Sequence, residues 1–155
     1  MNGIQVLLPR AGHWNHASPS DWAEVLATFP LFSGIAKRRL RKLVRNATVA
    51  EYGPGDMVIQ KGTSGNSLYL ILGGSAKALG KPASRSLRTG DYFGELSLLE
   101  GTPRTATVIA TSELHLMKLP GQTFLELTKD PEVTLKMLRP LGAQIRRLEA
   151  QPAQP

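Results

Sequence analysis

The chain has 155 residues, 41% of them hydrophobic and 20% charged, which is the size and composition of one globular domain with its own core. Cysteine is absent, which excludes disulfides, thiol catalysis and cysteine-ligated metal sites. No apolar run reaches the roughly 18 residues of a membrane-spanning helix, and the N-terminus shows no secretory signal, so we expect a cytoplasmic protein without a membrane span.

The net charge of +7 is concentrated in one short segment. Its cations are Lys37, Arg38, Arg39, Arg41, Lys42 and Arg45. Apolar residues at helical spacing alternate with them and predict an amphipathic helix with an outward basic face; they are Ala36, Leu40, Leu43, Val44 and Ala47. A solvated helix face is the first interpretation of this charge. A docking surface for an acidic partner is the second, and direct DNA binding is the third.

In chain order, residues 1–17 are expected to form an irregular arm. Ser18 then predicts a helix start as N-cap, with Pro19 in the first helical position and Asp21 completing a capping box. Pro30 ends that helix, and Ser33 is a candidate cap for the basic helix.

Between about residues 46 and 119 the pattern changes to short apolar runs separated by glycine-rich turns. The expected strands are 57–60, 68–72, 76–79, 105–110 and 113–119. Regular short strands between turns predict an antiparallel β-roll that resembles a jelly-roll barrel.

Helices return after the strands. One is expected at 122–129, and a second starts with Asp130 as its cap and Pro131 in its first turn, with a kink at Pro140. The fold class is therefore α+β, an antiparallel β-roll with N-terminal helices and two C-terminal helices. Residues 18–149 form this domain, and residues 150–155 are an expected disordered tail.

The run Phe93–Val108, FGELSLLEGTPRTATV, carries the chemistry. Gly94 has no Cβ and lets the backbone approach a ligand closely. Glu95 opens a predicted short helix whose free N–H groups attract an anion. After a second glycine turn at Gly101, Arg104 brings one guanidinium to the start of a strand. An anion-binding helix start, an arginine for phosphate and a glutamate for hydroxyl groups together suit a sugar phosphate.

This run resembles the phosphate-binding cassette of the cyclic nucleotide-binding domain family, which occurs in kinase regulatory subunits, cyclic-nucleotide-gated channels and bacterial catabolite activators. The resemblance extends from about Leu31 to Glu149, and the turn glycines match the family's turns. Those glycines are Gly53, Gly55, Gly62, Gly65, Gly74 and Gly90. The resemblance implies a regulatory module that binds cAMP or cGMP as its ligand and needs no cofactor.

The resemblance also implies roles for the cassette residues. Arg104 stands at the place of the arginine that pairs with the exocyclic phosphate oxygens, a task that suits its planar two-donor fork. Glu95 matches the residue that accepts a hydrogen bond from the ribose 2′-hydroxyl. Contacts mainly through backbone N–H groups are implied for Gly94, Leu96, Ser97, Thr105 and Ala106.

Further positions bear on the purine base. Thr105 and Arg85 resemble features of cGMP-binding members, but many cAMP-binding members carry the same Arg-Thr pair. The character of the sequence favours a bacterial source, where cAMP is the commoner ligand, so cAMP is expected first and cGMP second. A C-terminal helix covers the base in this family, and its candidate contacts here are Leu141, Ile145 and Arg146.

The sequence thus predicts a cyclic-nucleotide sensor whose C-terminal helices move about a hinge near residues 124–131 to control an unknown effector protein. The alternatives are a fragment of a larger channel, kinase or transcription regulator, and a structural roll that has lost its ligand. Few residues follow Leu148, so no helix-turn-helix for specific DNA binding is expected. His13 and His16 lack acidic or cysteine partners, and no catalytic set or P-loop is present, so neither a metal site nor an enzyme is expected.

Overall fold

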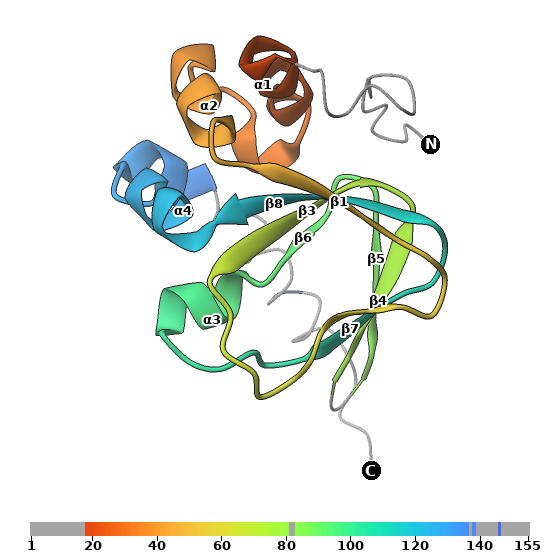
Figure 1. Ribbon diagram of the computed structural model, residues 1–155. Coiled ribbons are helices and arrows are strands. Elements are labelled where there is room, and N and C mark those ends of the chain that lie inside the picture. Colours follow the sequence, from red (N-terminus) through yellow and green to blue (C-terminus); the bar gives the residue numbers. More distant parts are fainter. Residues whose placement is uncertain (1–17, 81–82, 137, 139–145, 147–155) are drawn as a thin grey trace.

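The computed structural model describes residues 18–80, 83–136, 138 and 146. In this part of the chain, helices flank two antiparallel sheets of four strands each (Figure 1). The predicted α+β fold with a roll of strands is confirmed. The predicted arm at 1–17, the tail at 150–155 and the kink at Pro140 lie outside the described residues.

The strands form two sheets, ordered β1-β8-β3-β6 and β2-β7-β4-β5. The first contains β1 (Thr48–Tyr52), β8 (Leu114–Pro120), β3 (Ser67–Gly73) and β6 (Tyr92–Phe93). The second contains β2 (Met57–Ile59), β7 (Thr107–Ala110), β4 (Ser75–Leu79) and β5 (Arg85–Arg88). Every neighbouring pair is antiparallel. Among the described residues, the edge strands of each sheet pair on one side only, so the predicted roll is open and its strands do not close into a barrel.

Strand β3 is buried on both faces, and its alternate side chains enter two different cores. Leu68, Leu70 and Leu72 belong to the core under the N-terminal helices, whereas Tyr69 and Ile71 belong to the core between the sheets. Because successive side chains of a strand point to opposite faces, a central strand with both faces covered needs a continuous apolar run.

Helix α1 (Pro19–Ala27) begins at the predicted capping box. Asp21 N donates to Ser18 Oγ at 3.2 Å, and Ser18 N donates to Asp21 Oδ2 at 2.9 Å. These two bonds satisfy backbone donors that the first helical turn leaves without partners. The start of this helix is therefore encoded locally.

A 3₁₀ turn, η2 (Pro30–Phe32), connects α1 to the basic helix α2 (Lys37–Val44). The prediction that Ser33 caps α2 is wrong. Ser33 instead ends η2, and α2 starts after Ala36 without a side-chain cap. The left-handed turn at Gly34 (φ +82°) separates the two elements and moves the helix start down the chain.

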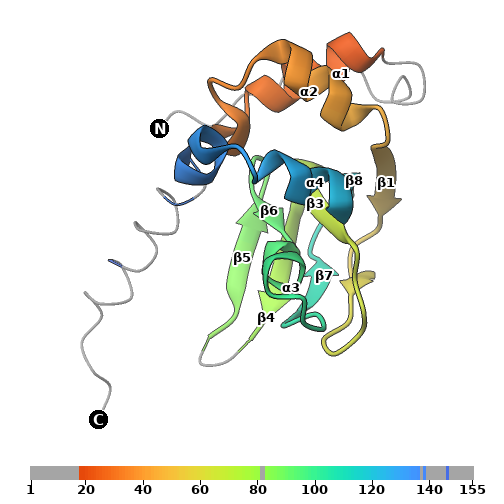
Figure 2. The ribbon, with the colours of Figure 1, turned by 90° about the vertical axis from the view of Figure 1, so that its left-hand side faces the viewer.

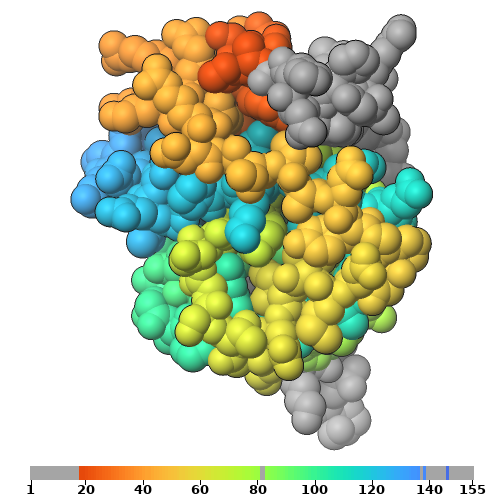
Figure 3. Space-filling model, in the orientation of Figure 1, coloured from red at the N-terminus to blue at the C-terminus, as the bar shows by residue number. Residues whose placement is uncertain are grey.

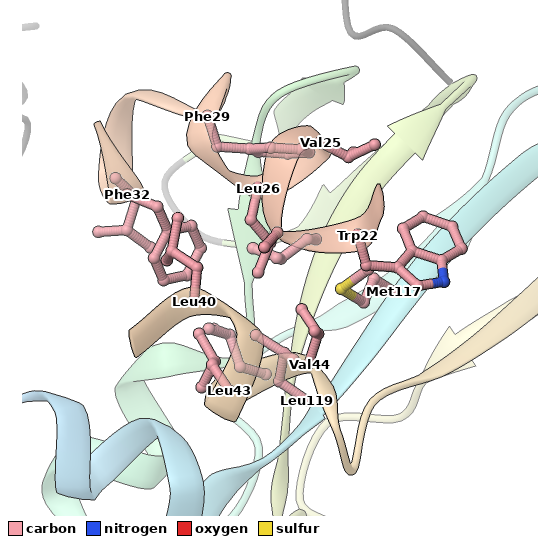
Figure 4. Packing of buried hydrophobic residues seen from close by; sticks show 14 of the residues in the cluster. Trp22, Val25, Leu26, Phe29, Phe32, Leu40, Leu43, Val44, Met117 and Leu119 are labelled. Carbon is pink, nitrogen blue, oxygen red and sulfur yellow. The ribbon is translucent and has the colours of Figure 1, made fainter. Parts of the chain in front are cut away.

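The N-terminal helices pack onto the outer face of the first sheet (Figure 4). Their contribution to this core includes Trp22, Val25, Leu26, Phe29, Phe32, Leu40, Leu43 and Val44. Strand β8 supplies Met117 and Leu119 from below. The apolar stripe of α2 faces this core, so the cations of α2 face outward as predicted.

Helix α4 (Gly121–Leu127) follows β8 directly, one residue earlier than predicted, and ends two residues earlier. Asp130 caps the next helix as predicted, since Glu132 N donates to its Oδ1 at 2.9 Å. Residues 131–136 of that helix lie beside the N-terminal helices (Figure 2).

Two polar contacts join this last helix to the N-terminal layer. Arg39 of α2 forms an ion pair with Asp130, and Lys136 Nζ donates to the carbonyl oxygen of Ser33 at 2.7 Å. Val133 is buried in the same apolar core. The start of the last helix is thus held by polar contacts with the N-terminal layer and by the apolar core that this layer shares with the first sheet.

Candidate functional site

Helix α3 (Glu95–Glu100) follows β6 and lies next to α4 (Figure 2). Gly94 precedes it with a φ of +92°, and Gly101 ends it with a φ of +67°. Side chains rarely adopt these left-handed angles, so glycine suits both turns. The short helix and the two glycine turns expected around it are confirmed.

Arg104 lies at the centre of this segment and is only 5% exposed. Its Nη1 donates to the carbonyl oxygen of Gly94 and to Ser97 Oγ, both at 2.9 Å. Its Nη2 donates to the carbonyl oxygen of Ser67 at 2.8 Å. A guanidinium has five N–H donors. Among the described residues, therefore, one N–H on Nε and one on Nη2 remain for a ligand.

Aromatic rings support the same guanidinium. The Arg104 guanidinium carbon lies 5.8 Å from the centre of the Tyr69 ring, and Tyr69 stacks on Phe93 with 5.1 Å between ring centres. Burial lowers the pKa of Arg104 below its ordinary value, while Tyr69 and Glu95 oppose that shift. The cation is thus fixed in orientation and position before any ligand arrives.

Gly65 leaves the space that Arg104 occupies. A Cβ at Gly65 would lie 1.8 Å from Arg104 Nε, and a Cβ at Gly94 would lie 2.7 Å from Nη1. Backbone hydrogen bonds also join the loop at 62–65 to the segment at Arg104. Arg104 N donates to Thr63 O, and Gly62 N donates to Arg104 O, each at 2.8 Å. The loop at 62–65 therefore packs against Arg104 and forms part of the site.

Sequence reasoning assigned no role at the site to Gly65, Ser67 or Tyr69. Gly65 was visible as a turn glycine, but its contact with Arg104 depends on how two distant loops meet. Ser67 acts through its carbonyl oxygen, which every residue carries, so no residue-type signal could have found it. Tyr69 looked like an ordinary apolar strand residue.

Glu95 is the first residue of α3 and is half-buried. Burial raises the pKa of its carboxyl above the ordinary value, and a hydrogen bond to its own backbone, together with the charges of Arg85 and Arg104, acts in the opposite direction. The structure thus brings Glu95 into the electrostatic field of both arginines. A carboxylate that lacks full hydration has much to gain from a hydroxyl donor.

The remaining predicted residues differ in placement. Ser97 is buried, Ala106 is half-buried, and Leu96 and Thr105 are exposed. Strand β7 begins at Thr107, not at Thr105 as predicted, because the backbone of Arg104 forms hydrogen bonds with the 62–65 loop instead of with a neighbouring strand.

Three positions were considered for contacts with the base. Arg85 is an exposed residue of β5. Arg146 is an exposed helical residue, and no contact places it at the cassette. Ile145 and Leu141 lie outside the described residues.

The raised pKa of Glu95 predicts a pH-dependent stability effect. The folded chain keeps this proton to a higher pH than the unfolded chain, so the group favours folding at low pH and loses this contribution as the pH rises through the folded pKa. We expect Glu95→Gln, without ligand, to raise the urea midpoint at pH 7, and the gain to shrink as the pH falls toward about 4.

Urea titrations monitored by circular dichroism at several pH values measure this effect. Glu100→Gln is the matched control, since Glu100 ends the same helix and is exposed. A lower midpoint for Glu95→Gln at pH 7 would show that the carboxylate stabilises the fold and would contradict the argument.

Two further searches bear on the class of site. In residues 18–80, 83–136, 138 and 146, no group of three or more His, Cys, Asp or Glu side chains could hold a metal ion. Within the same part of the chain, no helix has the length and apolar character needed to cross a membrane.

Known proteins resemble this chain in sequence and in fold. A cAMP-dependent protein kinase regulatory subunit of Hypocrea atroviridis is 35% identical over 120 residues, which cover 77% of this chain and 26% of that protein. A cGMP-dependent 3′,5′-cGMP phosphodiesterase A of Dictyostelium discoideum is 24% identical over 124 residues, which cover 80% of this chain and 14% of that protein. The chain spans about a quarter of the length of the first curated relatives it matches.

Among solved structures, the regulatory domain of Toxoplasma gondii PKA with cAMP matches with a TM-score of 0.70 and 24% identity, covering 81% of this chain and 49% of that chain. This likeness shows the fold. None of these three relatives is bacterial, so the predicted bacterial source gains no support from them. The family model described as the cyclic nucleotide-binding domain matches residues 49–130, more than half of the chain. The chain therefore belongs to the cyclic nucleotide-binding domain family.

Proposed function

We propose that this chain binds a cyclic nucleotide, cAMP in the first place and cGMP in the second, and that binding regulates a partner protein. The observation that supports this most is the state of Arg104, a buried guanidinium with three acceptors among the described residues and two N–H groups that none of those residues accepts. A preorganised arginine fork suits two oxygens of one phosphate and loses little conformational freedom on binding. The names of the relatives support a cyclic nucleotide as the source of that phosphate.

In this proposal, different cassette residues contact different parts of the ligand. Arg104 pairs with the exocyclic phosphate oxygens, and Glu95 accepts from the ribose 2′-hydroxyl. Gly94, Leu96, Ser97, Thr105 and Ala106 contribute backbone N–H groups. Ser97 has a second task, because its hydroxyl already holds Arg104 Nη1 in place.

The base meets the outer part of the site. The charge of Arg85 acts on the Glu95 carboxyl, and its contact with the purine is part of the proposal. Ile145 and Arg146 stay proposals for the cover of the base. Exposed Thr105 is available to either purine, so its presence does not separate cAMP from cGMP.

Regulation follows from differential binding to two arrangements of the C-terminal helices. In this arrangement the Arg39–Asp130 ion pair and the Lys136–Ser33 hydrogen bond hold the last helix on the N-terminal layer. A protein kinase is the partner suggested by the Hypocrea relative. The chain acts without catalysis of its own, does not bind specific DNA, and is placed in the cytoplasm by this proposal.

Isothermal titration of the chain with cAMP, cGMP, 2′-deoxy-cAMP and 5′-AMP tests the proposal. We expect cAMP to bind with a dissociation constant of about 1 μM or tighter, near −8 kcal/mol. The 2′-deoxy analogue should bind at least about fivefold more weakly, because Glu95 then stays without its donor, at a cost of about 1–3 kcal/mol. Absence of heat from both cAMP and cGMP at millimolar concentration would overturn the proposal and favour the structural roll.

A further inference from the structure

A groove of about 560 Å³ lies on the side of the molecule away from the roll's interior, where α2 meets α4 and the start of the last helix. Half-buried Leu127 and exposed Pro131 give it an apolar floor, and Leu43, which also lines it, is buried in the core. Arg39 and Lys42 of α2 stand on one wall. In Figure 3 the orange surface of α2 and the blue surface of α4 meet along the left-hand side, where these elements adjoin.

The wall formed by α2 continues into the basic face of that helix. All six cations between residues 37 and 45 are exposed. Lys37 has an ion pair with Glu24 at 3.7 Å, and Arg39 has one with Asp130. In the described part of the chain the other four have no acidic partner; they are Arg38, Arg41, Lys42 and Arg45. Lys129 adds a further exposed cation on the opposite wall.

Two acidic residues line the groove, Asp130, which pairs with Arg39, and Glu126, and they do not balance the cations of its walls and of the adjoining α2 face. The chain has 12 acidic residues, and Glu149 is the one that lies outside the described residues. The segments that the structure does not describe therefore contain one acidic side chain. A second copy carries the same net charge of +7 and is repelled at long range.

The mixture of surfaces favours a protein segment over a nucleic acid. A single-stranded nucleic acid gains from an uninterrupted cationic track and from aromatic rings on which its bases stack, and no aromatic residue is among the described residues that line this groove. An amphipathic helix satisfies both features, with apolar side chains on Leu127 and Pro131 and carboxylates over the lysines and arginines.

We propose that the groove between α2 and α4 docks an acidic, amphipathic segment of a partner protein. The occupant lies along α2, with its carboxylates over Arg41, Lys42 and Lys129 and its apolar side chains on the groove floor. Asp130, which pairs with Arg39 at the groove edge, also begins the last helix. The Arg39–Asp130 ion pair therefore links the groove to the start of the last helix.

The probe is a fluorescein-labelled synthetic peptide of about 18 residues, roughly five helical turns, with leucine on one face and glutamate on the other. Fluorescence anisotropy with the full chain should give saturable binding that weakens between about 0.05 and 0.15 M salt. A second peptide with every leucine replaced by serine should bind at least tenfold more weakly.

Variants locate the binding. Lys42→Glu combined with Lys129→Glu should weaken the peptide at least tenfold, about 1.4 kcal/mol. Lys77→Glu is the matched control, since Lys77 is an exposed lysine on β4 outside the groove. Circular dichroism of each variant checks the fold, and cAMP titration, which should be unchanged, separates this proposal from the nucleotide site.

Four outcomes would overturn the inference. They are no binding at millimolar peptide, equal binding of the serine peptide, equal weakening by Lys77→Glu, and tighter binding of a single-stranded DNA oligonucleotide than of the leucine–glutamate peptide. Equal binding of the serine peptide or equal weakening by Lys77→Glu would show that the peptide binds only by non-specific charge attraction. Tighter binding of the DNA oligonucleotide would show that the surface binds nucleic acid.

Discussion

Arg104→Ala is expected to lower the affinity for cAMP by roughly a hundredfold or more, about 3 kcal/mol. Truncating one partner of a buried, hydrogen-bonded charge pair costs about 2–5 kcal/mol, largely because the other charge is left without its counterion. The substitution also leaves the acceptors on Ser67, Gly94 and Ser97 without their donor, so a loss of stability of about 1–3 kcal/mol accompanies it. Calorimetry and urea titration measure the two effects separately.

Two further variants make this prediction sharp. Arg104→Lys keeps the charge, but one ammonium cannot serve three separated acceptors and a phosphate fork, so it should also bind weakly. Arg38→Ala removes an exposed cation on α2 and should leave cAMP affinity unchanged. Equal affinities for the wild type and for a folded Arg104→Ala would remove Arg104 from the proposed site.

Gly65→Ala is expected to weaken cAMP binding more than tenfold, although Gly65 offers no side chain to a ligand. The added methyl group would lie 1.8 Å from Arg104 Nε and 2.2 Å from its Cζ, so the guanidinium has to move. Overpacking of this kind costs about 1–3 kcal/mol in stability. Gly65 is not among the glycines with positive φ, so the effect comes from the close contact and not from backbone strain.

Gly80→Ala is the control for this prediction. The nearest atom to a Cβ at Gly80 is Ala83 O at 3.6 Å, an ordinary contact distance. Calorimetry with cAMP should therefore give wild-type affinity for Gly80→Ala. If Gly65→Ala keeps both wild-type stability and wild-type affinity, the 62–65 loop is free to yield and does not fix Arg104.

The sequence predicted those parts of the fold whose signals are local. The Ser18–Asp21 capping box, the left-handed turns at Gly94 and Gly101 and the short helix between them need only nearest neighbours along the chain. Asp130 as a helix cap belongs to the same class. Ser33 shows the limit of this reasoning, because a good cap residue has no effect when a glycine turn delays the helix.

The environment of Arg104 could not be predicted, because it depends on contacts between distant segments. The Ser67 carbonyl lies 37 residues away in sequence, and Gly65 meets the guanidinium through the packing of two loops. The open roll is a similar case, since pairing of edge strands depends on sheet twist and register rather than on residue type. The family could be predicted from the resemblance of the cassette, whereas the orientation of Arg104 could be seen only in the structure.

The burial of β3 on both faces has a consequence for the dynamics of the site. Ser67, whose carbonyl holds Arg104, is the first residue of that strand, and the strand contributes side chains to both cores. Displacement of the whole strand would therefore expose parts of two hydrophobic clusters at once, which places that motion near the free energy of global unfolding. We therefore expect ligand-driven motion in the elements around β3 rather than in the strand that carries the Ser67 carbonyl.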